Sequence, residues 1–188
     1  MEHFFQNIQG WFIYDSYYTQ AVNDAKDGAH FVEVGAWKGR SSAFMTVTIA
    51  NSGKKIQFDV IDTWLGSPGI EVCQTEPHVV AGTLYQHFLS NMAPAWGYFT
   101  PIRLSSAEAV KLYADECLDF CLIDASHDYE DVKLDIQSWL PKVKKGGVLA
   151  GDDYAWEGVG RAVQELLPDA IVHSSIGCWH YTKPACSV

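Results

Sequence analysis

Four carboxylates in this sequence lie at or near the ends of apolar, β-favouring runs, and their type and spacing are suited to ligand binding. These residues are Glu33, Asp62, Asp124 and Asp152. If the runs form parallel strands, their carboxyl ends meet at one edge of the sheet, where such folds open a ligand crevice. Ionised carboxylates accept hydrogen bonds from hydroxyl and ammonium groups. The sequence therefore predicts an acidic crevice along one sheet edge.

The twelve-residue run 31–42 joins one of these acids to a glycine turn and to the start of a helix. Gly35 and Gly39 let the backbone turn sharply and approach a ligand closely. The pair Ser41–Ser42 is expected to cap the helix that follows. A strand, a turn and a helix N-terminus in this order predict a nucleoside pocket.

The elements that must position these residues alternate between β-favouring runs and helical patterns, which is typical of βαβ units and a mostly parallel sheet. Apolar spacing over 132–143 predicts a helix, with Lys142, Lys144 and Lys145 at its C-terminal end. The turn at 174–177 suits an antiparallel hairpin. We expect an α/β, Rossmann-like three-layer sandwich with a seven-stranded sheet. The predicted strands are 30–35, 56–62, 98–103, 118–123, 147–152, 170–175 and 178–183.

The length of 188 residues suits one domain, residues 1–188, which is large enough to bury a substantial core. Residues 1–28 are expected to form an N-terminal helical segment. Residues 64–97 fit the alternating pattern least well, because prolines and glycines, Pro68 and Gly69 among them, interrupt an amphipathic stretch. We expect this segment to cap the crevice as a lid.

Composition and charge narrow the class of partner. The formal charge of −10 repels a phosphate backbone, so nucleic acid is a poor partner and a small molecule fits better. No apolar stretch reaches the length of a membrane span, and the first residues lack the pattern of a secretory signal, so we expect a cytoplasmic protein. The five cysteines are odd in number and lack C-x-x-C pairs, which favours reduced thiols. A homo-oligomer stays open.

Three motifs, EVGAWKGRSS, IDTW and IDASHDYEDVKLDIQSWLPKVKKGGVLAGDDY, carry a resemblance to a known family. Together they resemble the class I S-adenosylmethionine-dependent methyltransferases. The sequence is most similar to the small O-methyltransferase-like branch, the family 24 type, which includes macrolide-sugar and catechol-type O-methyltransferases. The resemblance covers about residues 29–167.

The resemblance implies an S-adenosylmethionine site along the predicted sheet edge. It places the acid and the turn of the first motif beside the methionine part of the cofactor, and Asp62 at its two ribose hydroxyls. Ser105 and Ser106 match the position that flanks the adenine. Ser105 is equally consistent with a helix N-cap, because Glu108 follows it at capping-box spacing. The implied cofactor-binding residues are Glu33, Gly35, Ala36, Trp37, Gly39, Ser41, Asp62, Ser105, Ser106 and Asp124.

The resemblance also implies a metal and a base. Asp124, Asp152 and Asp153 match positions that bind metal in the catechol-type and macrolide-sugar enzymes, and Mg²⁺ prefers such oxygen ligands. His127 matches a catalytic position, and neutral imidazole can take a proton from a substrate hydroxyl. Asp124 and His127 are thus the expected catalytic residues. A turn-capping role for the acids at 152 and 153, and a structural role for His127, stay open.

The expected function is methyl transfer from S-adenosylmethionine to an oxygen of a small acceptor, and Tyr154, Trp156 and His78 are candidates for lining the acceptor pocket. Two alternatives remain. A nicotinamide-dependent oxidoreductase would need a G-x-G-x-x-G turn, whereas Gly35 and Gly39 have G-x-x-x-G spacing. A non-catalytic protein that keeps the cofactor fold would bind S-adenosylmethionine without turnover.

Overall fold

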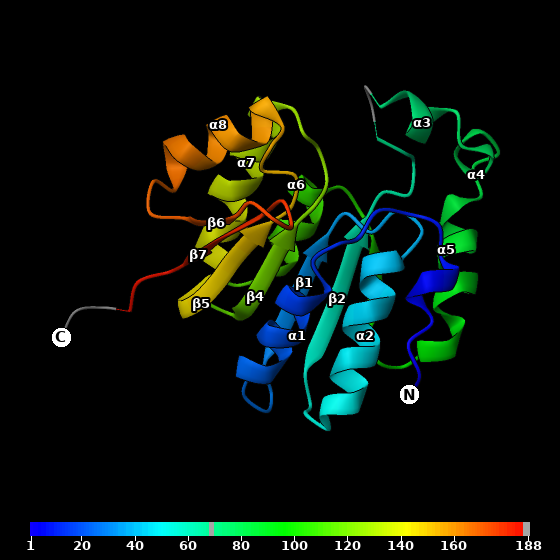
Figure 1. Ribbon diagram of the computed structural model, residues 1–188, viewed down its shortest axis with the longest axis horizontal. Coiled ribbons are helices and arrows are strands. Elements are labelled where there is room, and N and C mark those ends of the chain that lie inside the picture. The colour runs from blue at the N-terminus through cyan, green and yellow to red at the C-terminus, as the bar shows by residue number, and fades with distance from the viewer. Residues whose placement is uncertain (68–69, 186–188) are drawn as a thin grey trace.

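The computed structural model describes residues 1–67 and 70–185, and within them seven strands form one sheet (Figure 1). The strand order is β3-β2-β1-β4-β5-β7-β6. The first five strands in this order are parallel to one another, whereas β7 runs antiparallel to both β5 and β6. The predicted Rossmann-like sheet with an antiparallel C-terminal hairpin is confirmed. The strands are β1 (His30–Val34), β2 (Gln57–Asp62), β3 (Thr100–Arg103), β4 (Leu118–Ile123), β5 (Val143–Gly151), β6 (Ile171–His173) and β7 (Cys178–Thr182).

Helices cover both faces of the sheet, which gives the three layers expected (Figure 1). The α-helices are α1 (Asp15–Asp24), α2 (Arg40–Ser52), α3 (Glu71–Gln74), α4 (Pro77–Val80), α5 (Leu84–Met92), α6 (Ser106–Ala109), α7 (Tyr129–Trp139) and α8 (Glu157–Leu166). Short 3-10 turns lie at η1 (Phe5–Asn7), η2 (Ala93–Ala95), η3 (Val110–Leu112) and η4 (Leu140–Lys142).

Alternating side chains of the buried strands supply the two cores. On β1, Phe31 packs in the cluster that holds α1, α2 and α5, and Val32 packs in the cluster that holds α6, α7 and α8. On β4, Phe120 and Cys121 divide in the same way. Strands that are buried on both faces are what a parallel sheet between two helical layers requires. The core thus fixes the sheet edge that carries the acids.

The helix predicted over 132–143 begins and ends too late in the sequence. α7 ends at Trp139, Pro141 lies in η4, and Val143 already begins β5. Proline lacks the N–H that a continuing helix would need, which explains the early end. Lys144 therefore lies on a strand, where its ammonium is 2.7 Å from a carboxylate oxygen of Asp119, and it does not complement a helix C-terminus.

The predicted capping role of Ser41 and Ser42 is wrong. The N-cap of α2 is Gly39, whose φ of +93° is the left-handed conformation that glycine adopts readily. Both serines lie inside the helix and are buried. The Ser42 hydroxyl instead donates to the carboxylate of Glu33, so it connects α2 to β1.

The segments expected to form a helical N-terminus and a lid have mixed structures. In the first 28 residues, only η1 and α1 are helical. In the segment 64–97, α5 belongs to the core, and its Phe88 and Met92 pack against Gly39. Pro68 and Gly69 lie outside the described residues. Among the described helices, none combines the length and apolar character that a membrane span needs.

Candidate active site

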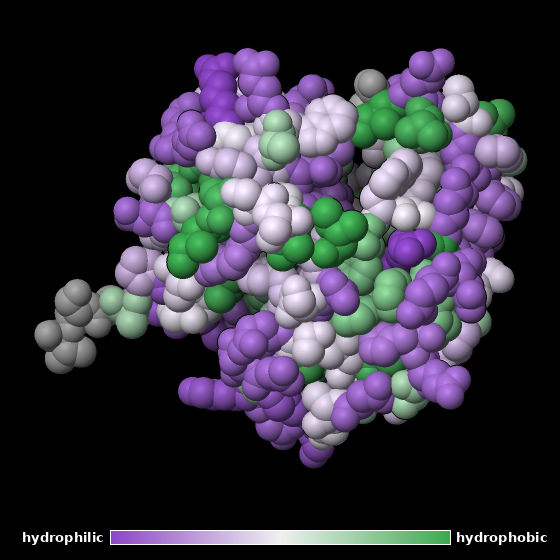
Figure 2. All heavy atoms as spheres, in the orientation of Figure 1, coloured by the Kyte–Doolittle hydropathy of each residue, from purple (hydrophilic) through white to green (hydrophobic). Residues whose placement is uncertain are grey.

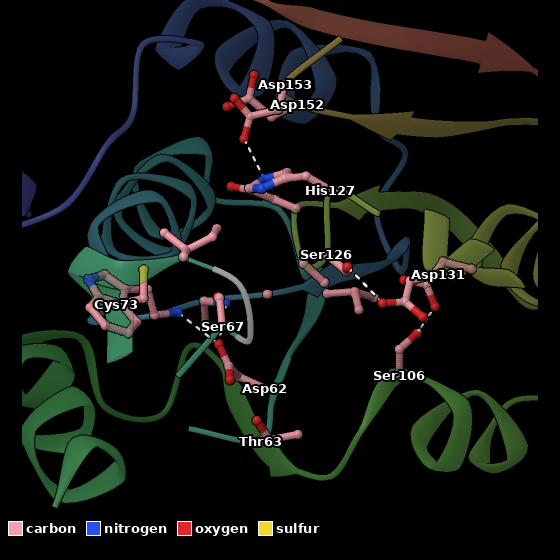
Figure 3. A pocket seen from close by; sticks show the side chains of 18 of the residues that line it. Asp62, Thr63, Ser67, Cys73, Ser106, Ser126, His127, Asp131, Asp152 and Asp153 are labelled. Atoms are coloured by element: carbon pink, nitrogen blue, oxygen red, sulfur yellow. Dashed lines mark hydrogen bonds and ion pairs between the residues drawn. The ribbon is translucent and has the colours of Figure 1, made fainter. Parts of the chain in front are cut away.

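A cavity of about 1020 Å³ opens at the carboxyl ends of β1, β2, β4 and β5, which is the edge that the sequence predicted. The hollow is visible in the space-filling view, bordered by hydrophobic residues (Figure 2). Figure 3 shows three polar groups around it: Asp152, Asp153 and His127 at one end, Asp62 and Thr63 at another, and a serine–aspartate group beside α6. Its volume is at the upper end of ordinary small-molecule sites, enough for a cofactor with a second small ligand.

The turn after β1 and the end of β4 are in direct backbone contact. Gly35 has a φ of +94°, and a Cβ at this position would lie 1.8 Å from the carbonyl oxygen of Asp124. The N–H of Asp124 also donates to the carbonyl of Val34 at 2.7 Å. Only glycine fits at residue 35, because any side chain would overlap the backbone of β4.

Asp62 holds the turn after β1 in place. Its Oδ2 accepts the N–H groups of Ala36 and Trp37, each at 2.8 Å, and its Oδ1 accepts the N–H of Trp64 at 2.6 Å. Each carboxylate oxygen offers about two acceptor sites, so Oδ2 is filled and Oδ1 keeps one free. In this conformation Asp62 can bind one hydroxyl through Oδ1 while it holds the turn.

Glu33 lies beneath the cavity and is 1% exposed. Its carboxylate accepts hydrogen bonds from the hydroxyls of Tyr18, at 2.8 Å, and Ser42. Burial raises the pKa of Glu33 to about 7, although these hydrogen bonds act in the opposite direction. Of the residues expected beside the methionine part, Gly35, Ala36, Trp37 and Ser41 line the cavity, whereas Glu33 and Gly39 are not among the lining residues described.

Ser105 and Ser106 line the cavity and also have structural partners. The predicted capping box is formed, since Ser105 is the N-cap of α6 and its N–H donates to the Glu108 carboxylate at 3.2 Å. Ser106 donates to the buried carboxylate of Asp135 and accepts the indole N–H of Trp139 at 2.8 Å. Burial raises the pKa of Asp135 to about 6. These serines fix the wall that would face an adenine.

The acids after β4 and β5 form a compact group with a histidine. One ligand atom from each of Asp124, His127 and Asp153 lies within 4.8 Å of the others. His127 Nε2 is 2.7 Å from Asp153 Oδ2, as drawn in Figure 3. The sequence predicted Asp152 as a third acid beside Asp124 and Asp153. In the structure Asp152 is a charged neighbour of Asp124, and its Oδ1 accepts from the thiol of Cys178 at 3.4 Å. The group best placed to hold a metal is therefore Asp124, His127 and Asp153.

Burial and the repulsion between neighbouring carboxylates disfavour the ionised form of the acids in this group. They raise the pKa of Asp124 to about 8, with Asp152 and Asp153 as the charged neighbours. The contact with Asp153 raises the pKa of His127 above its usual value, which favours the imidazolium form. A cation at this point would relieve the repulsion, so the donor set fits a divalent metal.

Two parts of the site were not expected from the sequence. Residues 10–13, ahead of α1, line the cavity, and so does Arg40 at the start of α2. The next residue, Tyr14, is fully buried and donates its hydroxyl to Asp124 Oδ2 at 3.0 Å. The aromatic run Trp11-Phe12 is the one sequence signal that could have pointed to this segment.

Of the aromatic and histidine residues proposed for the acceptor pocket, Trp156 lines the cavity. Its ring stacks on His127, with centroids 4.6 Å apart and an angle of 24°. Tyr154 and His78 are not among the lining residues that the structure describes. Tyr154 instead accepts a hydrogen bond from Gln164 at 3.0 Å.

Residues 32–154 match a family model described as a methyltransferase domain. The chain belongs to this methyltransferase family. The match includes the glycine turn, Asp62 and all members of the Asp124, His127 and Asp153 group. The family assignment and the seven-stranded sheet together confirm the predicted class I O-methyltransferase-like architecture.

Known proteins similar to this methyltransferase share its fold at low sequence identity. The O-methyltransferase NovP is 16% identical, with 91% of this chain and 79% of that chain covered and a TM-score of 0.70. A SAM-dependent O-methyltransferase from Thermotoga maritima is 13% identical, with 96% and 69% covered and a TM-score of 0.60. At such identities the likeness concerns the fold.

A curated relative, "Uncharacterized protein y4gI" from Sinorhizobium fredii (strain NBRC 101917 / NGR234), is 22% identical over 151 residues, which is 80% of this methyltransferase. The chain spans only 16% of that relative's length.

Proposed function

We propose that this methyltransferase transfers the methyl group of S-adenosylmethionine to an oxygen of a small-molecule acceptor, with a divalent cation at Asp124, His127 and Asp153. One observation carries the proposal: Asp62 and this acid–histidine group lie at two ends of one cavity. A donor and an acceptor bound at those ends would meet in the space between them. The family assignment and the O-methyltransferase fold support the choice of reaction.

The donor end suits a cationic nucleoside. When bound, S-adenosylmethionine supplies a methyl group that its sulfonium already activates. Asp62 would bind a ribose hydroxyl through Oδ1 and keep the turn at Ala36 and Trp37 in place through Oδ2. Ser105 and Ser106 would face the adenine. The protein therefore contributes mainly orientation, which can account for much of the rate of such a transfer.

The acceptor end suits a hydroxyl group beside a cation. A bound Mg²⁺ would lower the pKa of the acceptor hydroxyl and orient it. Asp124 and Asp153 supply hard oxygen ligands and His127 a nitrogen, and Tyr14 fixes the orientation of Asp124. Hydrogen bonds to a ligating carboxylate are part of such sites, since they hold it in one geometry.

His127 has a second candidate role that one observation favours. Its Nε2 lies 2.7 Å from Asp153 Oδ2, and among the described residues neither of its two buried ring nitrogens has a hydrogen-bond partner of good geometry. Because Asp153 raises the pKa of His127, the ring can take a proton only at a pH above that raised pKa, where the imidazole is neutral. His127 would then act as a metal-free general base. Methyl transfer that persists in excess EDTA would support this role over the ligand role.

Calorimetry with S-adenosylhomocysteine tests the cofactor assignment. We expect binding to the parent protein and at least a tenfold weaker Kd for Asp62→Ala, which loses both the hydroxyl acceptor and the support of the turn. Asp128→Asn, an exposed position on the cavity wall, is the control and should bind as the parent does. Absence of binding to the parent, or equal affinity of Asp62→Ala, would refute the proposal.

The two alternative functions give different results in the same experiment. A nicotinamide-dependent oxidoreductase would bind NAD and not S-adenosylhomocysteine. A non-catalytic cofactor-binding protein would bind S-adenosylhomocysteine but transfer no labelled methyl group to any hydroxylated acceptor, with or without Mg²⁺. The family match opposes the first of these.

A further inference from the structure

The mouth of the cavity carries exposed apolar side chains that the proposed donor and metal sites leave unexplained. Trp11 is 67% exposed, Ile13 62%, Val72 54% and Trp156 51%, and all four line the same cavity. They come from the segment before α1, from α3 and from the loop before α8. We call these four residues the apolar rim. Exposed apolar groups gathered around a cavity mark a ligand-binding surface more often than isolated ones do.

The apolar rim reaches the acid–histidine group through one contact. Trp156 stacks on His127, whose Nε2 is 2.7 Å from Asp153. A flat molecule against the rim could therefore place a hydroxyl next to Asp124 and Asp153 without leaving the indole surface. Aromatic rings pack well against Trp in offset or edge-on arrangements.

The charge of the cavity wall limits what such a molecule can carry. Seven of the described lining residues are aspartates, and Arg40 is the one Lys or Arg among them. The guanidinium of Arg40 already donates to the carbonyl of Ile8 at 2.8 Å and lies over the ring of Phe5. In formal charge, the seven carboxylates exceed Arg40, a protonated His127, one sulfonium cofactor and a divalent cation together. An acceptor with a carboxylate or phosphate would meet a wall of its own sign.

We propose that the acceptor is an aromatic alcohol that is uncharged or cationic, and that the acidic cavity discriminates against its anionic analogues. This inference rests on the proposed function, because it assigns the acceptor side of the same site. The ring would lie on the apolar rim beside Trp11 and Trp156, and the hydroxyl would face Asp124. The charge of the acceptor, and not only its shape, would decide whether it binds.

Three probes that share one ring and one hydroxyl test the charge rule: 2-naphthol, 6-(aminomethyl)-2-naphthol and 6-hydroxy-2-naphthoate. Each is titrated by calorimetry into protein saturated with S-adenosylhomocysteine and Mg²⁺. We expect the neutral and cationic probes to bind and the carboxylate to bind at least tenfold more weakly, with a difference that shrinks in high salt. Equal or tighter binding of the carboxylate would overturn the proposal.

Matched tryptophan variants test the rim. Trp11→Ala should weaken the binding of 2-naphthol at least fivefold and leave the Kd of S-adenosylhomocysteine within twofold. Trp96→Ala is the control, because Trp96 is 61% exposed and is not among the described cavity residues. Unchanged naphthol binding in Trp11→Ala would overturn the proposal. A lower molecular mass of Trp11→Ala than of the parent, measured by light scattering, would also overturn it. The apolar rim would then be a contact between two copies of the chain.

The failure of this proposal and that of the proposed function are distinguishable. If S-adenosylhomocysteine binds but none of the three probes does, the acceptor class is wrong and the cofactor assignment stands. If S-adenosylhomocysteine does not bind, the proposed function is wrong, and the probes are titrated into the protein alone. The ranking by charge then still supports or overturns the inference about the cavity.

Discussion

The hydroxyl of Tyr14 donates a hydrogen bond of 3.0 Å to Oδ2 of Asp124, across 110 residues of sequence. Tyr14 is fully buried, and it directly follows the segment that contributes Trp11 and Ile13 to the cavity. The position of the N-terminal segment and the orientation of the Asp124 carboxylate, a proposed metal ligand, are therefore connected through one side chain.

Replacing Tyr14 with Phe should weaken divalent metal binding. The variant keeps the ring but removes the donor that holds Asp124, and partners of this kind are commonly worth ten- to a hundredfold in metal affinity. We expect about a tenfold weaker Kd for Mn²⁺ by calorimetry. Tyr17→Phe, in the helix α1 that begins directly after Tyr14 but packed against His180, is the control and should not change the Kd. Equal Mn²⁺ affinity in both variants would show that Tyr14 only fills space.

The two adjacent acids after β5 should differ in their effect on the metal. Asp153 belongs to the group with Asp124 and His127, whereas Asp152 accepts from Cys178. Asp153→Asn should therefore weaken Mg²⁺-dependent methyl transfer, with a KM for Mg²⁺ raised at least tenfold. Asp152→Asn should stay within about threefold of the parent. The reverse order would return Asp152 to the place that the sequence suggested.

The buried Glu33 should make stability depend on pH. Burial raises its pKa from the usual 4.5 to about 7 in the folded protein. The folded state therefore binds a proton that the unfolded state releases between these values, and the resulting stabilisation is complete below pH 4.5 and lost as the pH rises through 7.

Glu33→Gln removes this titration. Relative to the parent, the variant should gain stability between pH 5 and pH 8, by about 1–3 kcal/mol, because one pKa unit corresponds to about 1.4 kcal/mol. Urea unfolding at the two pH values measures the difference. Glu2→Gln, at an exposed position, should show no such trend. A parallel pH dependence for parent and Glu33→Gln would contradict the assignment.

The two glycines at the ends of α2 offer a matched test of packing against strain. Gly39 and Gly53 both have positive φ, +93° and +70°. A Cβ at Gly39 would lie 3.0 Å from the ring of Phe88, whereas a Cβ at Gly53 would have no atom of the described residues within 4 Å. Gly53→Ala should lose about 1 kcal/mol from backbone strain, and Gly39→Ala about 1–3 kcal/mol more from overpacking. Similar losses of stability in the two variants, measured by thermal unfolding, would mean that α5 shifts to accommodate the added Cβ with no loss of stability.

The fold was predictable because its signals are local and repeated. Apolar runs that end in Asp62, Asp124 and Asp152 identify strand ends, and the topology of an α/β sheet brings those ends to one edge. The first and last residues of the individual helices and strands were less predictable. The predicted helix continues to Val143, but Pro141 follows the end of α7 at Trp139, and Val143 is the first residue of β5.

The candidate site was predictable in outline and not in its partners. Glu33 and Asp62 look alike in sequence, as acids near strand ends. The difference lies in contacts from distant segments: Tyr18 and Ser42 enclose Glu33, whereas the partners of Asp62 leave one acceptor site free. Likewise, the thiol of Cys178 in β7 donates to Asp152, a contact that the spacing of the acids does not predict. Such tertiary contacts leave no trace in local spacing.

Gly35 has a consequence for how this enzyme could diversify. Because the carbonyl of Asp124 occupies the space of the missing side chain, no rotatable group lies between the proposed donor and acceptor halves at this point. The main chain after β1 and the main chain after β4 are thus held at a fixed separation at this point. Under the proposed function, changes on the apolar rim could exchange one acceptor for another without altering this backbone contact between the two halves of the site.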